Sequence, residues 1–451
     1  MTWTFVSGRV RLQTTLKIQH HRPSTGSIEM ADSAAGDEGV RREVYERVTT
    51  FFLRHRYEEV QIEFLPFYPV PDGYIYTEAT SVGIPKSSLL KAFQHAHKLF
   101  FDTLQSSSPS RSQSSLSVLL AASNVLLLHD SEHLTAINTR KRLLLSAFPP
   151  ASPLATSAAA VTAPRPQSQG QGHSQAVQHE PPLVTPYTEL TFLNSLLTSP
   201  LHRHTKSPHL WSHRRWLLTT YPSLIRPVAP GSHPDVAAKA ARKWARKEIS
   251  TLLRAAEAHP KNYYAWTFAR WLASAQDVRF NHEDLVGWCI KHTGDVSGWS
   301  FLAWLWIAER DRFRYCWSQA SQSSASQPGG QAARMAMEHS DTVAQRYNQL
   351  LRVIKYSHEI APGHESLWRF VRGVLTQDIL AGEHAALIVG MLRDWDRAEW
   401  PSRVADDIVR ERVLLRELVR ELDRRMLQMQ VQSHAGGGGG GVDAEMVDRP
   451  P

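Results

Sequence analysis

The sequence has very little cysteine and no long apolar run. These two features limit the classes of protein to which it can belong. Its 451 residues include two cysteines, Cys289 and Cys316. Their spacing matches neither a zinc-binding motif nor a redox motif, so we expect a reducing, cytoplasmic setting. The longest apolar stretches, 116–128 and 299–308, are well short of the ~20 residues that a membrane helix needs. We therefore predict no membrane span.

Recognisable catalytic motifs are also absent. We find no glycine-rich phosphate loop that leads into a helix, no Gly-x-Ser-x-Gly and no convincing pair of carboxylates. His209 and His213 have the i, i+4 spacing that can hold zinc on one helical face, but no third ligand follows. We interpret both as structural residues, and we predict neither a metal site nor a cofactor in this chain.

The charge is moderately positive and spread along the chain. Lysine and arginine number 51 against 43 acidic residues, for a net charge of +8. The basic residues do not gather with aromatic ones in a nucleic-acid-reading motif, so we expect no nucleic-acid partner. No acidic residue precedes Glu29, which is compatible with a mitochondrial transit peptide or with an extension ahead of a second start at Met30. We predict that residues 1–39 are a disordered extension.

Tryptophan is plentiful, with 14 in the chain, and many of them recur in one kind of segment. Its strongest copy spans residues 206–218 and reads KSPHLWSHRRWLL. Weaker copies lie at 261–272, 297–305 and 364–375. In the weakest copy, 135–144, Ile137 stands where the others have their first tryptophan. We number positions from these reference residues, which are Ile137, Trp211, Trp266, Trp299 and Trp368.

The residues that follow each reference position indicate a helix. Four places on stand Lys141, Arg215, Arg270 and Arg372 in four of the copies, and six places on stand Leu or Val. Offsets of three, four and seven share one helical face. We predict that each helix buries its reference residue. Arg215 and Arg270, one turn later, should stack on that ring or pair with a carboxylate of the neighbouring helix.

Such a helix needs a partner to cover its apolar face, and apolar stripes at helical spacing precede three of the copies. One of them is Leu190, Leu193 and Leu197, ahead of Trp211. The predicted fold is therefore all-α, an alpha-alpha superhelix made of repeated helix pairs. The spacing of the copies is irregular, and insertions between units need not break the stack.

Composition divides the chain further. We predict N-terminal helices and a first repeat at 40–147, with a short strand at 59–65. Central repeats should span 187–317, and a C-terminal repeat with capping helices should span 346–430. The helix over 404–429 fits either a cap or a coiled-coil seam. Three segments lack the large apolar residues of a core, and we predict a disordered insertion at 148–186, a low-complexity insertion at 318–345 and a flexible tail at 431–451.

The repeats resemble those of the protein prenyltransferase alpha-subunit family, whose hallmark is an Asn-Tyr-x-x-Trp helix followed by Arg and Trp. Here the hallmark is matched by 262–266 with Arg270 and Trp271, and by Trp211 with 213–216. The Ser-Pro-x-x-Trp form of the strongest copy is similar to the branch that holds the alpha subunit proposed for a third type of protein geranylgeranyltransferase. The resemblance covers roughly residues 124–375.

The resemblance implies an alpha subunit that forms a crescent around a zinc-bearing beta subunit. The pair would transfer a geranylgeranyl group to a C-terminal cysteine of a substrate protein. In this family the alpha subunit lends polar groups to the isoprenyl diphosphate. The matching positions here are Lys206, as a catalytic cation, and Lys261 and Tyr264, as substrate-binding residues. The alternative for each lysine is a solvated side chain just ahead of a helix.

Three departures from the family pattern keep a second hypothesis open. Ser207 and Pro208 replace the Asn-Tyr pair, Ala303 replaces a cation and Gly373 replaces a tryptophan. The alternative is a solenoid scaffold for protein–protein interaction that has lost, or never had, a part in catalysis.

Overall fold

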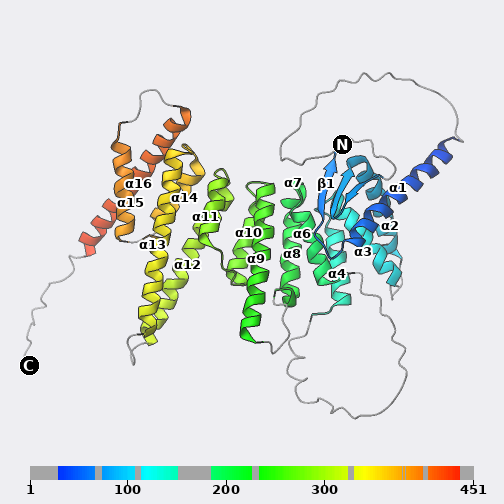
Figure 1. Cartoon of the computed structure of the whole chain (residues 1–451), viewed down its shortest axis with the longest axis horizontal. Helices are drawn as coiled ribbons and strands as arrows, with labels where there is room; N and C mark the ends of the chain where they lie inside the picture. Colours follow the sequence, from blue (N-terminus) through cyan, green and yellow to red (C-terminus); the bar gives the residue numbers. More distant parts are fainter. Residues whose placement is uncertain are drawn as a thin grey trace, which may run out of the picture.

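The computed structural model describes residues 29–66, 74–106, 113–150, 184–225, 233–323, 330–377, 379–380, 382–399 and 405–436. Within them, helices follow one another in pairs along the long axis of the molecule (Figure 1). The first helices of the pairs are α3 (Gln113–His129), α6 (Pro186–Leu197), α9 (Pro234–Ala258), α11 (His282–Lys291), α13 (Gly330–Glu359) and α15 (Glu383–Arg397). The second helices are α4 (Leu134–Ala147), α8 (Pro208–Thr220), α10 (Tyr263–Ala275), α12 (Val296–Ser323), α14 (Glu365–Thr376) and α16 (Asp406–Gly436).

Each first helix packs against the second helix of its pair, and the second helices also contact one another in chain order. Two short elements, α7 (His202–Thr205) and the 3₁₀ turn η1 (Pro222–Leu224), lie before and after α8. The predicted all-α superhelix is confirmed. No helix in the described part of the chain is long and apolar enough to cross a membrane.

A small module precedes the repeats. Helices α1 (Glu29–Arg54) and α2 (Lys86–Gln105) pack with α3 beside the strands β1 (Gln61–Leu65), β2 (Tyr76–Glu78) and β3 (Ser81–Pro85). The strand order is β1-β3-β2, with β1 parallel to β3 and β2 antiparallel to it. The strand predicted at 59–65 is β1, and the sequence analysis missed the other two.

Helices are present within three of the segments that composition set apart from the repeats. Helix α1 begins at Glu29, inside the predicted extension 1–39. Helices α12 and α13 take up most of 318–345, and α16 continues to Gly436, inside the predicted tail 431–451. The residues concerned are rich in Ala and Gln, which are good helix formers. Phe313 of α12 stacks on His339 of α13 at 3.7 Å between ring centroids, so this pair of long helices is also packed. Residues 1–28, 151–183 and 437–451 lie outside the described part of the chain.

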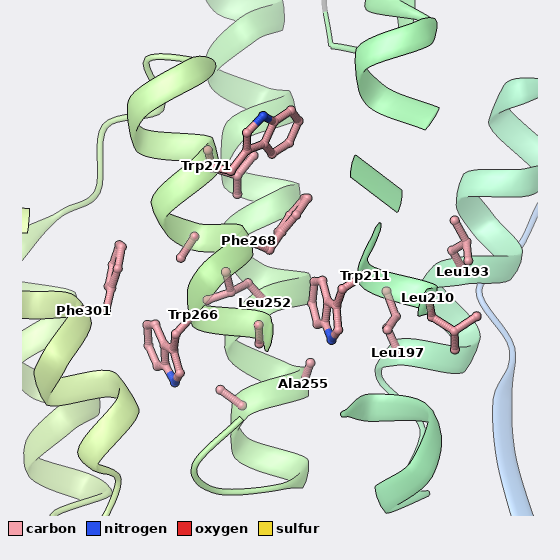
Figure 2. Close-up of a cluster of buried hydrophobic side chains, with 14 of the residues drawn as sticks. Leu193, Leu197, Leu210, Trp211, Leu252, Ala255, Trp266, Phe268, Trp271 and Phe301 are labelled. Atoms are coloured by element: carbon pink, nitrogen blue, oxygen red, sulfur yellow. The ribbon is translucent and has the colours of Figure 1, made fainter. Parts of the chain in front are cut away.

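A ladder of aromatic contacts sets the step between repeat units. Trp211 packs on Phe268 at 5.2 Å between ring centroids, and Trp266 packs on Phe301 at 5.2 Å (Figure 2). Trp299 repeats the contact with Phe370 at 5.0 Å. In each case the reference tryptophan meets the residue two places after the next reference tryptophan. The second helices therefore stack in one register, whatever the length of chain between them.

A parallel ladder joins the cations to the next unit. Lys141 lies over the Trp216 ring, Arg215 over Trp271 and Arg270 over Trp304, at 5.3, 5.6 and 5.8 Å from the ring centroids. For Arg215 and Arg270, the prediction of stacking on their own tryptophan or pairing with a carboxylate names the wrong partner. Arg372 does pair with a carboxylate of a neighbouring helix, that of Glu421 in α16. The position four after one reference residue meets the position five after the next. In the same register, Ala303 takes the place of the cation and Gly373 takes the place of the tryptophan that this cation would cover. The two departures from the family pattern therefore remove one contact between neighbouring units.

Buried arginines one position earlier hold the first helices in place. Arg140 reaches Glu189 of α6 at 2.9 Å from its Nε, and Arg214 reaches Glu248 of α9 at 2.8 Å from its Nη2. Both arginines are almost fully buried, at 2% and 0% exposure. Removing one member of a buried ion pair leaves the other charge in a poorly solvating interior.

We predict that Arg214→Ala lowers the free energy of unfolding by about 3–5 kcal/mol, because Glu248 is left buried without its cation. Its neighbour Arg215 is exposed and lies over the Trp271 ring. Arg215→Ala should cost about 0.5–1 kcal/mol. Chemical denaturation followed by circular dichroism gives both values, and equal losses would contradict this account of the buried pair.

We also predict that Ala303→Arg and Gly373→Trp stabilise each other. An added Cβ at Gly373 meets nothing within 4 Å, so a side chain can leave the backbone there without a clash. A double-mutant cycle should give a favourable coupling of about 0.5–1 kcal/mol, the size of one exposed cation–aromatic contact. Pairing Ala303→Arg with Gly390→Trp, which also has open space around it, is the matched control and should give no coupling.

Candidate functional site

The second helices of the central repeats begin with capping residues that also tie neighbouring units together. The Oγ atom of Ser207 accepts a bond from the Leu210 N–H at 3.1 Å and donates to the Ser131 carbonyl at 3.2 Å. Asn262 accepts from the Ala265 N–H at 3.2 Å, and its Nδ2 donates to the Thr205 carbonyl at 2.8 Å. The asparagine of the hallmark is therefore a helix cap with a second bond to the preceding unit.

The reference tryptophans use the same junctions. Trp211 Nε1 donates to the Thr205 carbonyl at 2.8 Å, which makes that carbonyl a shared acceptor with Asn262. Trp299 Nε1 donates to the Thr293 carbonyl at 3.0 Å. Trp266 differs, because its buried Nε1 has no partner within the described residues.

The junction ahead of Trp266 has an unusual backbone. Lys261 has a φ of 61°, in the left-handed region that is unfavourable for a residue other than glycine. Its N–H donates to the carboxylate of Asp295 at 2.7 Å, and the same carboxylate accepts from the Gly298 N–H at 2.9 Å at the start of α12. Asp295 thus holds the strained lysine and caps the next second helix.

These bonds bring the predicted site residues to one edge of the repeat units. Lys206 is half-buried and directly precedes Ser207, whereas Lys261 is exposed and directly precedes Asn262. Because Asn262 is bonded to Thr205, the two lysines flank a single hydrogen bond. Tyr264, 37% exposed, lies in the first turn of α10 with its ring 5.5 Å from that of Tyr263.

Two histidines that the sequence analysis did not assign to this site lie at the same edge. The rings of His202 and His259 are 5.3 Å apart, and His259 Nε2 is 2.8 Å from the Pro200 carbonyl oxygen. Burial lowers the pKa of His259, and the nearby charges of His202 and Lys206 lower it further, against the effect of that hydrogen bond. Neither histidine occupies a position that recurs among the copies, so no repeat signal could have found them. We call Lys206, Lys261, Tyr264, His202 and His259 the junction edge.

The junction edge is suited to binding an anion. Within the described residues, neither Lys206 nor Lys261 forms an ion pair with a carboxylate. No group of three or more potential metal ligands occurs in the described part of the chain. We see no activated nucleophile at this edge, so its residues can supply positive charge and hydrogen bonds to a ligand whose chemistry is performed by other groups.

His209 and His213 each lie beside a glutamate carboxylate, which fits the structural roles expected for them. His213 is buried, and its Nε2 lies 2.7 Å from Glu189 Oε1, while His209 lies 3.2 Å from Glu132. Burial lowers the pKa of His213. Burial alone would raise the pKa of Glu189, but Arg140 and His213 outweigh it and hold the value at about 2.

A large groove lies elsewhere in the described structure. It has a volume of about 1420 Å³ and lies between the end of α10 and helices α11, α12 and α13. Its charges are largely paired, as in Arg312 with Asp277 at 2.8 Å and Arg346 with Glu309 at 2.7 Å. A smaller cavity of about 330 Å³ lies among α1, α3 and α6. Neither includes a residue of the junction edge.

Comparison with known proteins agrees with the repeat architecture. The model of the protein prenyltransferase alpha subunit repeat matches residues 187–221, and that of the ECM9 middle domain matches residues 233–325. The chain is similar to protein prenyltransferase alpha subunit repeat-containing protein 1 of Danio rerio, with 26% identity over 183 residues, 37% of this chain and 42% of the relative. The protein of the same name in Homo sapiens is 29% identical over 117 residues, 23% of this chain and 28% of the relative. The chain thus spans less than half the length of the curated relatives it matches.

We predict that Glu189 makes the free energy of unfolding depend on pH in the acidic range. Its folded pKa of about 2 lies below the ordinary value of 4.5. The carboxylate therefore contributes stability that is complete above about pH 5 and is lost as the pH falls from 4.5 toward 2.

In Glu189→Gln this contribution is absent, so the free energy of unfolding should fall less steeply between pH 5.5 and 3.5 than it does in the unchanged chain. Denaturant titrations at several pH values measure the slope. Glu132→Gln, at an exposed carboxylate, is the control and should leave the slope unchanged. The same slope in all three proteins would contradict the prediction.

Proposed function

We propose that this chain, in which residues 187–221 match the protein prenyltransferase alpha subunit repeat, is the alpha subunit of a heterodimeric protein prenyltransferase. The reaction moves an isoprenyl group, geranylgeranyl in our proposal, from its diphosphate to the thiol of a C-terminal cysteine in a substrate protein. The observation that carries the proposal is the Asn262–Thr205 hydrogen bond at 2.8 Å, which sets Lys206 and Lys261 on one edge.

The division of labour follows from what this edge offers. In the transfer the bond from carbon to the diphosphate oxygen breaks, a carbon–sulfur bond forms and the thiol loses its proton. Zinc in the beta subunit would lower the pKa of the substrate thiol, and the proton would pass to solvent. The ammonium groups of Lys206 and Lys261 bind the diphosphate and offset the charge that develops on it as it leaves. Tyr264 can donate a hydrogen bond from its hydroxyl to the same group.

The positions of the two lysines suggest unequal roles. Lys206 is half-buried beside His202 and His259, in surroundings that strengthen its attraction for an anion. Lys261 is exposed, but its strained backbone is held by Asp295, which fixes the point where its side chain starts. We therefore assign the catalytic cation to Lys206 and diphosphate binding to Lys261 and Tyr264. The proposed complex acts in the cytoplasm.

The experiment combines the purified chain with each prenyltransferase beta subunit of its source organism. Complex formation is read by size-exclusion chromatography, and transfer is read with fluorescent geranylgeranyl diphosphate and a peptide ending in a cysteine motif. We predict that the isolated chain is inactive and that one beta subunit restores transfer. Lys206→Ala should then lower kcat/KM by roughly 10²-fold, the usual effect of losing one preorganised charge contact.

Lys291→Ala, an exposed lysine at the end of α11, is the matched control and should keep full activity. Failure of every beta subunit to form a complex would overturn the proposal.

The second candidate is a non-catalytic scaffold that uses the same solenoid to bind proteins. In its favour is the contact missing between Ala303 and Gly373, where the ladder of repeat contacts is interrupted. A complex whose transfer rate is the same in Lys206→Ala, in Lys261→Ala and in the unchanged chain would favour this candidate.

A further inference from the structure

A stripe of positive charge runs along the outward face of α9. Lys239, Arg242, Lys243 and Arg246 are all exposed, and their spacing of three, four and seven puts them on one side of the helix. The opposite side is buried in the repeat through Trp244, Glu248, Leu252, Ala255 and other residues. We call these four cations the α9 stripe.

Within the described part of the chain, the α9 stripe has no partner of opposite charge. None of its four side chains forms a hydrogen bond or an ion pair there. The acidic residue that falls between Asp235 and Glu257 is Glu248, and it is buried against Arg214 on the other side of the helix. An exposed helical face with four adjacent cations and no carboxylate between them repels itself and attracts a polyanion.

The surroundings of the stripe decide which polyanion fits. The stripe is the ridge of a helix, and the first turns of α9, from Pro234 to Lys239, are exposed throughout. This end of α9 extends beyond α8 and α10 (Figure 1). A flat anionic surface can reach such a ridge, whereas an acidic peptide would be held better by a groove.

Apolar groups at the edges of the stripe favour a lipid surface over nucleic acid. Val236, 55% exposed, lies on the same side one turn earlier. Tyr187, 47% exposed, lies under the ammonium of Lys247 at 5.6 Å. One tyrosine at the rim does not make the row of rings on which successive bases stack. A valine and a tyrosine beside clustered cations suit the headgroup region of a bilayer.

We propose that the α9 stripe binds the surface of a membrane rich in anionic phospholipids. The binding is peripheral and electrostatic, it places the outward layer of the repeats against the bilayer, and it does not depend on prenyl transfer. Each cation adds a similar increment, and salt weakens all of them together.

The test is co-sedimentation of the full chain with vesicles. One set contains phosphatidylcholine alone, and the other contains phosphatidylcholine with about one third phosphatidylserine. The unchanged chain should bind the second set at physiological salt, leave the first set unbound and be released by about 0.5 M salt. The variant K239Q/R242Q/K243Q/R246Q should bind the anionic vesicles more than roughly tenfold more weakly. Its exposed substitutions should leave the circular dichroism spectrum unchanged.

The control variant K86Q/R142Q/K291Q/K355Q removes the same total charge from exposed positions on four different helices. It should bind almost as well as the unchanged chain. An equal loss in both variants would mean that net charge alone drives binding, and it would overturn the proposal. The proposal also fails if the unchanged chain ignores anionic vesicles, or if its stripe-dependent binding is found with polyglutamate or single-stranded RNA instead.

Discussion

The packing of one indole against the phenylalanine of the next unit is the constraint on which the repeat architecture depends. Trp211, Trp266 and Trp299 each make this contact with the same offset. A large flat ring has few ways to pack in a dense interior, so it fixes both the distance and the rotation between neighbouring second helices. Once that step is fixed, each residue that follows a reference tryptophan lies opposite a set position in the next unit, as the cation–aromatic contacts show. The chain between units can vary in length because it does not take part in the step.

Two arginines that are adjacent in sequence, Arg214 and Arg215, make different kinds of contact because they lie on different sides of the same helix. Arg214 is buried, and it is satisfied by Glu248 and by Asn194 of the preceding first helix. Arg215 points to the surface and covers the Trp271 ring of the following unit. The first joins the two layers of helices, and the second joins neighbours within one layer. Both arginines belong to the same repeat pattern, yet burial makes one of them far more costly to remove.

The junction edge is formed around one backbone carbonyl, that of Thr205, which accepts two hydrogen bonds. A carbonyl at the end of α7 accepts from the indole of its own unit and from the asparagine cap of the next one. The residues that follow Thr205 and precede Asn262 are lysines, so a bond that stabilises the stack also gathers positive charge. The α9 stripe lies on the outward side of a first helix, away from this junction, which leaves both surfaces free to act independently.

The sequence by itself determined the helix pairs, the burial of the reference tryptophans and the all-α class, because these follow from periodicities within single segments. It also placed Lys206, Lys261 and Tyr264 relative to their helices, although their suggested roles came from family resemblance. Local periodicity carries no information on contacts between segments far apart in the chain. For that reason the partner of Arg215, the shared absence at Ala303 and Gly373 and the approach of His202 to His259 were decided by the tertiary structure. The helices within 318–345 were missed for a related reason, since a polar segment of good helix formers becomes a stable helix when another helix packs on it.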